Sequence, residues 1–502
     1  MPTTTTEPSE PTPKLVRELG LVDATMIVMG SMIGSGIFIT SAESARLVGS
    51  PGWLLIAWGL AGLMTITGAL CCAELAAMMP KAGGQYVFLR EAYGPSLGFL
   101  FGWSMFLVVQ TGTIAAVAVA FAKFLGVLIP AVASDHYLVA PRVWGHYAIS
   151  LSTQQLVAIL LIVALTVTNT RGLRAGRLIQ NSFTFTKTIA LIGLIVVGLS
   201  LGLNPKAAAW TASWWNPAAN GWDPGKVQTS LNATGGLALA MLLGRAMIGP
   251  LFSQSAWNNV TFTGGEIRDP GRNLPRALML GCGTVIALYL LANIAYLVTL
   301  PLDQIQGAPQ DRVGTALMHA VFGRPGTVAM AVAILISTFG CVNGLILAGA
   351  RVYYAMARDG LFFERVGTTN RQHVPGVALV AQGVWACLLA LPVTVTADPS
   401  THEPIYGNLY SQLLEYIIPV DVAFYMLMVG AVTALRRKAP EAERPYRTLG
   451  YPLPALIYLG LAVLVVLDFI VMTPETSGIG VLIVLAGIPV YFLWSRVGRK
   501  AE

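Results

Sequence analysis

The sequence has few charged residues, and this scarcity sets its class. Only 11% of the 502 residues are Asp, Glu, Lys or Arg, whereas a soluble protein carries about 25%. Apolar runs of about 20 residues recur along the chain, each long enough to cross a hydrocarbon core about 30 Å thick. The sequence lacks the segments of about 10 residues, alternating in polarity, that a membrane β-barrel requires. We therefore expect a polytopic all-α membrane protein.

Cysteine is also scarce, which bears on metals and partner chains. All five cysteines fall within apolar runs, at spacings that match no metal site. We therefore expect no metal and no cofactor. Paired catalytic aspartates, an HExxH motif and a channel filter motif are missing as well. An intramembrane enzyme and a channel are accordingly weak alternatives.

Twelve spans are predicted from the apolar runs. They lie near residues 21–45, 53–79, 97–129, 152–170, 178–203, 234–262, 276–300, 325–357, 374–395, 409–435, 451–472 and 478–496. Residues 1–14, rich in Thr, Pro and Glu, are expected to be a disordered tail. The rest divides into five spans over 15–203, an outside loop over 204–233, five spans over 234–436, and two spans with a cytoplasmic tail over 437–502.

The distribution of Lys and Arg orients the chain, because cytoplasmic loops are enriched in both. With the N-terminus in the cytoplasm, 22 of the 31 basic residues fall in inside segments, six in outside loops and three within spans. Both termini are therefore expected in the cytoplasm, with the chain in the plasma (inner) membrane. The same asymmetry accounts for the net charge of +7 without a nucleic-acid partner.

Helix-weakening residues gather at two places. The stretch "GSMIGSGIF", residues 30–38, holds three glycines, and each destabilises a helix interior by roughly 0.5–1 kcal/mol. In "GPLFSQSA", residues 249–256, Pro250 removes a backbone donor. Each stretch lies in the first span of a five-span block. Such matching interruptions indicate the binding site of an inverted-repeat transporter.

An unwound stretch of helix exposes two kinds of backbone group. The N–H groups that begin one half-helix suit a carboxylate, and the C=O groups that end the other suit an ammonium. One broken helix can therefore hold both charges of a zwitterion. Helix packing is the alternative, because Gly30-xxx-Gly34 is also a small-xxx-small motif. The second break favours binding.

Long stretches between about residue 19 and residue 496 carry a family resemblance. They include "GSMIGSGIF", "PKAGGQYVFLREAYG", "QNSFTFTKTIAL", "LFSQSAWNNVTFTGGEIRDPGRNLPRAL" and "FGCVNGLILAGARVYYAMARDG". These stretches resemble the L-type amino acid transporters of the amino acid–polyamine–organocation superfamily. The resemblance implies twelve helices in a five-plus-five inverted repeat (the leucine-transporter-like fold), with helices 1 and 6 broken, and transport by alternating access.

The resemblance also implies a set of substrate contacts. The substrate carboxylate would lie on backbone N–H groups around Ser35 and Gly36, with Gly34 beside them. The carbonyl groups implied to meet the substrate amino group are those of Met32, Ile33, Phe252 and Ser253. The ring of Phe252 would close over the substrate as an outer gate. Asn258 matches a residue of the substrate pocket.

Two departures from the family pattern affect the expected substrate and partners. The family usually reads "FAYGGW" where this chain reads "FSQSAW", so Ser255 and Ala256 replace two glycines and are expected to narrow the side-chain pocket. Mammalian members use a cysteine in the loop after the third helix to join a glycoprotein. The loop "AVASDHYLVAPRVWGHYA" has none, so we expect no disulfide-linked heavy chain.

Charged residues within spans are candidates for function. Lys123 lies about 10 Å from the outer end of its span, and we expect it to snorkel. Lys187 lies about 14 Å deep. The resemblance implies that Lys187 takes the place of sodium at the first break, either as a permanent cation or as a titrating proton carrier. A structural salt bridge is the alternative. Glu74, near an inner end, is expected to be an inner gate or a loop anchor, with ordinary surface charge as the alternative.

Arg245 and Asp421 leave two interpretations open. In the first, Arg245 pairs with Asp421 or with Glu415 and acts in an outer gate. In the second, Asp421 faces the substrate, where it favours a basic side chain or carries a proton.

The sequence thus predicts a sodium-independent carrier that exchanges small or medium neutral L-amino acids. A proton-coupled or cationic amino acid or polyamine permease is the alternative. The amino acid and the lipid bilayer are the expected partners.

Overall fold

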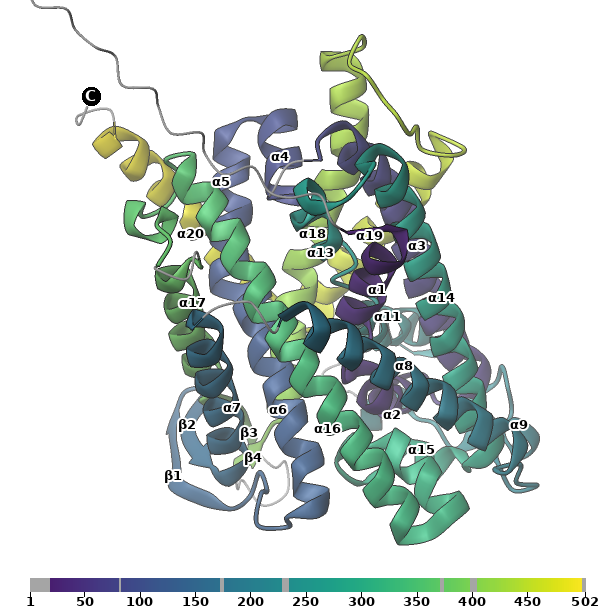
Figure 1. The fold of residues 1–502 in the computed structure, drawn as a ribbon. Helices are drawn as coiled ribbons and strands as arrows, with labels where there is room; N and C mark the ends of the chain where they lie inside the picture. The colour runs from purple at the N-terminus through teal and green to yellow at the C-terminus, as the bar shows by residue number, and fades with distance from the viewer. Residues whose placement is uncertain are drawn as a thin grey trace, which may run out of the picture.

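The computed structural model describes residues 19–80, 83–171, 176–227, 234–370, 374–397 and 404–498. For 176–182, 396–397 and 495–498 it describes the backbone alone. The tail expected at residues 1–14 lies outside the described residues. Long helices dominate the fold and run between two opposite ends of the molecule (Figure 1).

Most of the predicted spans are helices long and apolar enough to cross a membrane. Within the described ranges ten segments meet that measure, or eleven when one bent pair counts as a single span. The bent pair joins α1 (Leu21–Met32) to α2 (Gly36–Val48). The other segments are α3 (Pro51–Met78), α5 (Pro95–Ser104) continuing through the π-helical η1 (Met105–Val109) into α6 (Gln110–Leu128), α7 (Thr153–Thr170), α8 (Gly176–Ser200), α11 (Gly235–Ala246) with α12 (Ile248–Ser253), α14 (Pro270–Thr299), α16 (Val313–Arg358), α18 (Leu409–Lys438), α19 (Leu453–Met472) and α20 (Pro474–Gly498).

Short elements connect the long helices. They are α4 (Gln85–Tyr93), α9 (Ala208–Thr211), η2 (Pro217–Asn220), α10 (Pro224–Val227), α13 (Asn259–Phe262), η3 (Gly264–Glu266), α15 (Leu302–Gln306), η4 (Pro309–Asp311) and η5 (Glu364–Gly367). The predicted eighth span began at residue 325. Helix α16 begins twelve residues earlier and is kinked at Gly323, whose φ is 64°.

The ninth predicted span, 374–395, is partly wrong. Helix α17 (Gly376–Leu389) has only 14 residues, and strand β3 (Pro392–Ala397) follows it. The reason is local, because "PVTVTA" alternates and is rich in β-branched residues that favour strands. The strands β1 (Tyr137–Trp144), β2 (Tyr147–Ser152), β3 and β4 (Pro404–Tyr406) form one antiparallel sheet in that order. The spanning segments are thus helical, but the molecule as a whole is not all-α.

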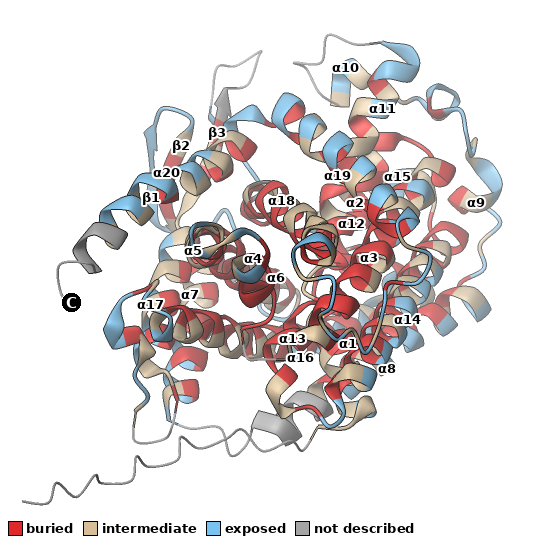
Figure 2. Cartoon of the chain, turned by 90° about the horizontal axis from the view of Figure 1, so that it is seen from above, coloured by how far each residue is buried: buried red, intermediate tan, exposed pale blue. Residues whose placement is uncertain are grey.

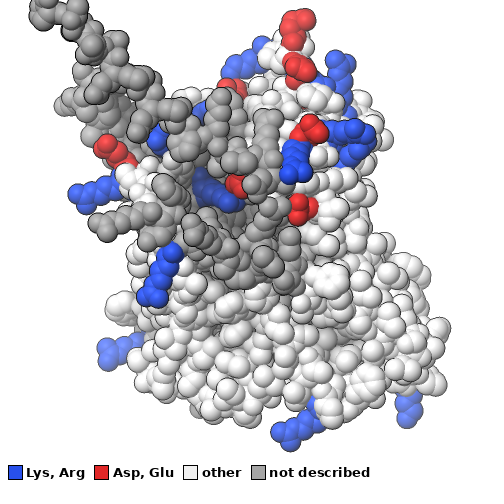
Figure 3. Space-filling model, viewed as in Figure 1, with Lys and Arg blue, Asp and Glu red and all other residues white. Residues whose placement is uncertain are grey.

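The two ends of the molecule differ. One end holds α4 and the last turn of α3 with Glu74, and we name it the Glu74 end; it lies at the top of Figure 1. The other holds the four strands and α15, and we name it the sheet end. On the face seen in Figure 3, charged side chains gather at the Glu74 end, and a nearly uncharged band separates them from a few at the sheet end. This band is the surface expected of a protein that crosses a lipid bilayer.

Burial is greatest in the centre of the helix bundle. Seen along the bundle, buried residues concentrate around α1, α3, α12, α16 and α18, and exposed residues lie mostly at the rim (Figure 2). The bent helix pair α1–α2 packs between α14, α8, α11 and α12. The centre therefore holds both predicted breaks.

Candidate functional site

The first break lies where it was predicted. Helix α1 ends at Met32 and α2 begins at Gly36, with a bend of 43° between them. Ile33 has an extended backbone, with ψ of 98°. Met32, Ile33 and Ser35 are all buried. The Phe38 N–H donates to the Ser35 carbonyl at 3.1 Å, so the N–H groups of Gly36 and Ile37 before it begin α2, inside the protein, without an acceptor in the helix.

The second break begins later than predicted. Gly249 and Pro250 lie within α12, and the helix ends only at Ser253. Residues 254–258 are irregular, and Ala256 has a left-handed φ of 65°. Pro250 lacks the N–H that would bond the carbonyl of Ala246. The hydroxyl of Ser44 donates to that carbonyl at 2.8 Å instead, so the helix tolerates the proline.

The two breaks are in direct contact. A β-carbon at Gly36 would overlap the hydroxyl of Ser253, so only glycine allows the two backbones this approach. Thr40 bridges them, because its hydroxyl donates to the carbonyl of Gly36 at 3.0 Å and lies 3.5 Å from Ser253 Oγ. The N-terminal turn of α2 and the C-terminal turn of α12 thus meet at one point, where groups of opposite partial charge face one another.

A tyrosine of α18 covers this point. The ring of Phe252 meets the ring of Tyr410 edge to face, with centroids 6.0 Å apart. The Tyr410 hydroxyl lies 3.1 Å from Ser35 Oγ. The gate role of Phe252 stays a prediction, and the sequence reasoning missed its partner Tyr410. A single tyrosine at the start of a helix gave no pattern from which to find it.

Side chains from α8 and α14 donate hydrogen bonds to backbone carbonyl groups around the first break. Lys187 is buried, and its ammonium donates to the carbonyl of Gly30. The Tyr289 hydroxyl donates to the carbonyl of Met32 at 2.9 Å, and the Tyr296 hydroxyl to that of Ile37 at 3.1 Å. Lys187 thus reaches the first break as the resemblance implied. The two tyrosines were missed, although their spacing of i and i+7 places both on one helix face.

Asn258 is engaged in the protein's own hydrogen bonds. Its amide N–H donates to Gln85 Oε1 at 2.7 Å, and its amide oxygen accepts from the Tyr425 hydroxyl at 3.0 Å. The neighbouring Trp257 stacks on Tyr425, with ring centroids 5.0 Å apart. Asn258 therefore ties the second break to α4 and α18, and its place in the substrate pocket stays a prediction.

Ser255 and Asp421 share a small cavity beside the second break. Its volume is about 20 Å³, enough for one water molecule. The lining residues are Met64, Thr65, Leu251, Gln254, Ser255, Trp257, Ile418, Asp421, Val422, Tyr425 and Tyr458. Asp421 is buried, and no hydrogen bond or ion pair joins its carboxyl group to another residue in the described ranges.

The predicted pairing of Arg245 with Asp421 is wrong, and the alternative pairing with Glu415 is confirmed. Arg245 Nη2 lies 3.3 Å from Glu415 Oε1, and Glu415 also accepts from the Thr476 hydroxyl at 2.8 Å. Glu415 precedes Asp421 by six residues on α18, about 9 Å toward the sheet end. The pair therefore links α11, α18 and α20 on the sheet side of the breaks.

Lys123 was predicted to snorkel, and this prediction is wrong. Its side chain is only 7% exposed, and its ammonium lies 3.9 Å from Asp311 and 3.5 Å from the amide oxygen of Asn408. Asp311 also pairs with Arg46 at 2.7 Å. The lysine turns inward because a carboxylate of the 309–311 turn is available there, which the distance along its own helix did not reveal.

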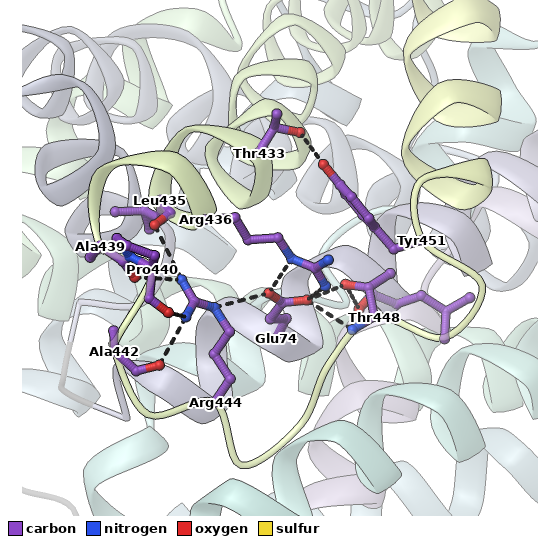
Figure 4. A network of polar contacts seen from close by, with 11 residues as sticks. Glu74, Thr433, Leu435, Arg436, Ala439, Pro440, Ala442, Arg444, Thr448 and Tyr451 are labelled. Atoms are coloured by element: carbon purple, nitrogen blue, oxygen red, sulfur yellow. Dashed lines mark hydrogen bonds and ion pairs between the residues drawn. The ribbon is translucent and has the colours of Figure 1, made fainter.

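Glu74 is the centre of a polar network at the Glu74 end (Figure 4). Its carboxylate, 1% exposed, accepts from Arg436 through Nε at 2.9 Å and Nη2 at 2.7 Å. It also accepts from the backbone N–H and the hydroxyl of Thr448, both at 2.8 Å, and lies 3.5 Å from Arg444. Arg444 donates to carbonyl groups at the end of α18. Glu74 therefore anchors α3 to α18 and to the loop before α19.

Three known proteins resemble this chain over nearly its whole length. A family model described as "Amino acid permease" matches residues 19–494. The "Large neutral amino acids transporter small subunit 2" of Mus musculus is 30% identical over 491 residues, covering 95% of this chain and 81% of that protein. The "Serine/threonine exchanger SteT" of Bacillus subtilis (strain 168) is 28% identical over 491 residues, covering 97% and 98%. The "Asc-type amino acid transporter 1" of Mus musculus is 28% identical over 490 residues, covering 95% and 81%.

Proposed function

The chain belongs to the amino acid permease family, and within that family we propose that it is a sodium-independent exchanger of small or medium neutral L-amino acids. It is an amino acid transporter and not an enzyme. The observation that carries the proposal is the meeting of the two breaks at Gly36 and Ser253. An α-amino acid carries a carboxylate and an ammonium on one carbon, and this meeting point offers backbone groups suited to both.

We propose the following roles around the bound amino acid. The N–H groups of the first turn of α2, around Gly34, Ser35 and Gly36, hold the substrate carboxylate. Carbonyl groups at the ends of α1 and α12, at Met32, Ile33, Phe252 and Ser253, receive the ammonium, those of Met32 and Phe252 in addition to the hydroxyl groups of Tyr289 and Ser255 that they already accept from. Phe252 with Tyr410 closes the site toward the sheet end.

The proposed architecture is a five-plus-five inverted repeat of twelve spans. Its halves are residues 15–203 and 234–436, and each begins with a helix that carries a break. We propose that the Glu74 end, with both termini, faces the cytoplasm and that the chain lies in the plasma (inner) membrane. The excess of Lys and Arg on inside segments supports this orientation. The Glu74 network would then lie at the inner gate, and the Arg245–Glu415 pair at the outer one.

Lys187 supports independence from sodium. Its ammonium donates a hydrogen bond to the Gly30 carbonyl near the first break, a group that a bound cation would otherwise coordinate. A tethered ammonium can bond this carbonyl without an ion taken from solution. We therefore propose that Lys187 is the coupling residue of this transporter.

The cavity beside Ser255 supports a small side chain. Ser255 and Ala256 stand where the family resemblance implies glycines, and the cavity that Ser255 lines measures only about 20 Å³. The names of the relatives span both sizes, from large neutral amino acids to serine and threonine. The cavity favours the smaller substrates. Its Asp421 also favours one alternative, a proton-coupled or cationic amino acid permease, because a buried carboxyl group suits a proton or a basic side chain.

Exchange in proteoliposomes tests the proposed function. Vesicles loaded with unlabelled serine, alanine or leucine are placed in labelled serine, with empty vesicles as the control. We expect uptake that saturates with concentration and needs internal amino acid. Uptake that is equally fast into empty vesicles and driven by a pH gradient would instead establish the proton-coupled alternative.

A further inference from the structure

The four-stranded sheet is built from two loops that lie far apart in the sequence. The hairpin of β1 and β2 connects α6 to α7, and β3 and β4 follow α17. Ile149 of β2 pairs with Pro392 of β3, which joins the two loops. Gln155 at the start of α7 donates to the carbonyl groups of Ala390 and Leu391 at 2.9 and 3.0 Å. The sheet is therefore fixed to the ends of α7 and α17 (Figure 1).

The two faces of strand β2 are inverted relative to a strand whose outer face meets water. On β2 the buried positions are the small or polar Ala148, Ser150 and Ser152, whereas Ile149 between them is 48% exposed. Strand β1 is exposed on both faces, and Trp144, which pairs with Tyr147 on the same face as Ile149, is 78% exposed. An outward apolar face above a small and polar inner side is the pattern of strands that contact lipid.

Helix α17 alone is too short to cross a bilayer. Its 14 residues extend about 21 Å, against a hydrocarbon core of about 30 Å. The exposed residues Val377, Val380, Val384 and Leu388 form one stripe along it. Strand β3 begins three residues after α17 ends, paired with β2. The sheet therefore continues the apolar surface of α17 where the helix stops.

We propose that this face of the sheet lies in the phospholipid leaflet at the sheet end, at the boundary between headgroups and acyl chains. Full immersion in hydrocarbon is excluded, because β1 is at the edge of the sheet and its outer backbone groups need water or headgroups as partners. Trp144 and Arg142, which pair with Tyr147 and Ile149 on this face, suit the interface, where aromatic rings and long cationic side chains place a polar group in water. The sheet and the lipid against it then occupy the part of the bilayer thickness that α17 is too short to cross.

Depth-dependent quenching tests this proposal in the full-length protein. Trp144→Cys and Val139→Cys are made separately in a Cys387→Ala background, because the other four cysteines are buried. Each variant is labelled with an environment-sensitive fluorophore and reconstituted into phosphatidylcholine vesicles. Quenchers are nitroxide on the lipid headgroup, nitroxide deep in the acyl chain, and aqueous iodide. Leu160→Cys on α7 is the lipid-exposed control, and Lys226→Cys is the water-exposed control.

We expect labels at 144 and 139 to be quenched several-fold more by headgroup nitroxide than by iodide, and less by the deep nitroxide than the label at 160. Iodide quenching equal to that at 226 would overturn the proposal. Protection from all three quenchers would also overturn it, because a protein or a second copy would then cover the sheet. Amino acid exchange by the labelled variants confirms that they are folded, and the lipid result does not depend on which substrate is exchanged.

Discussion

Gly36 lies directly against Ser253, so the first residue of α2 touches the last residue of α12. These residues are more than two hundred positions apart, and each ends or begins a half-helix. Their contact leaves no room for a β-carbon at residue 36. The close approach of the two breaks therefore depends on glycine at position 36. A substitution at this position tests whether the approach is needed for binding.

Gly36→Ala is expected to lower the free energy of unfolding by about 1–3 kcal/mol, because its β-carbon overlaps Ser253, and to abolish exchange. Gly36→Val would be too large to separate folding from binding. Ser253→Gly should restore much of the lost stability in the double variant. Gly59→Ala is the matched control, since nothing lies within 4 Å of its added carbon. Thermal unfolding in detergent and serine exchange are the measurements; normal exchange by Gly36→Ala would contradict the assignment of the breaks.

The backbone binding of both substrate charges predicts which analogues compete. Serine should inhibit uptake, whereas ethanolamine, which lacks the carboxylate, and glycerate, which lacks the ammonium, should compete poorly. Each analogue leaves one set of backbone groups without its charged partner. Competition against labelled serine measures this. Tight binding of ethanolamine would count against the proposed role of the N–H groups of α2.

The breaks could be predicted from the sequence because their cause is local. Glycine and proline weaken a helix wherever they stand, so "GSMIGSGIF" indicated the first break without knowledge of its neighbours. The depth of Lys187 along its helix likewise indicated a buried charge. The second break was placed a few residues early, because Ser44 on another helix satisfies the carbonyl that Pro250 leaves without a donor.

The remaining differences have tertiary causes. Tyr410, Tyr289 and Lys123 act through partners on helices far away in the sequence, and helical spacing alone does not reveal which helix lies opposite. The short α17 is different, because the alternation in "PVTVTA" was a local signal for a strand. The length of the apolar run concealed it.

Lys187→Ala is expected to reduce exchange severely, because it leaves the Gly30 carbonyl without the ammonium that bonds it. Lys187→Met, which keeps the apolar stem, should be equally inactive if the charge is what matters. Replacing sodium by choline should not change wild-type uptake. Lys206→Ala, at a solvent-exposed position between α8 and α9, is the neutral control. A steep sodium dependence of the wild type would contradict the proposed role of Lys187.

Ser255→Gly is expected to widen the range of substrates toward Tyr and Trp, because it removes a side chain that lines the cavity. Ala256→Gly is the matched control at the next position. It relieves a left-handed φ of 65°, which costs a residue with a β-carbon about 1–2 kcal/mol, so it should raise thermal stability more than it changes specificity. Exchange of labelled amino acids of increasing size measures the range. A wild type that already prefers Trp would show that Ser255 does not limit the pocket.

Glu74→Gln is expected to lower the free energy of unfolding by about 3 kcal/mol, because it leaves Arg436 and Arg444 without their buried carboxylate. Glu91→Gln provides the control. Its pair with Arg90 is much more exposed, so the change should cost less than about 1 kcal/mol. Chemical unfolding of both variants tests the difference. Equal stability of the two would mean that Glu74 does not anchor α3 to α18.

Asp421→Asn distinguishes the interpretations of the buried carboxyl group. Because Arg245 pairs with Glu415, the stability effects of Asp421→Asn and Arg245→Gln should add. Arg245→Gln and Glu415→Gln should instead be non-additive, with the double variant partly recovering the stability that each single variant loses.

A carboxyl group that carries a proton or meets the substrate predicts a further change in function. Asp421→Asn should then flatten the pH dependence of exchange or alter competition by Lys and Arg. The other titratable groups in the cavity, Tyr425 and Tyr458, are unchanged in this variant, so a changed pH dependence would be due to residue 421. Unchanged pH dependence and unchanged competition would remove Asp421 from the transport cycle and leave it as a cavity-lining residue.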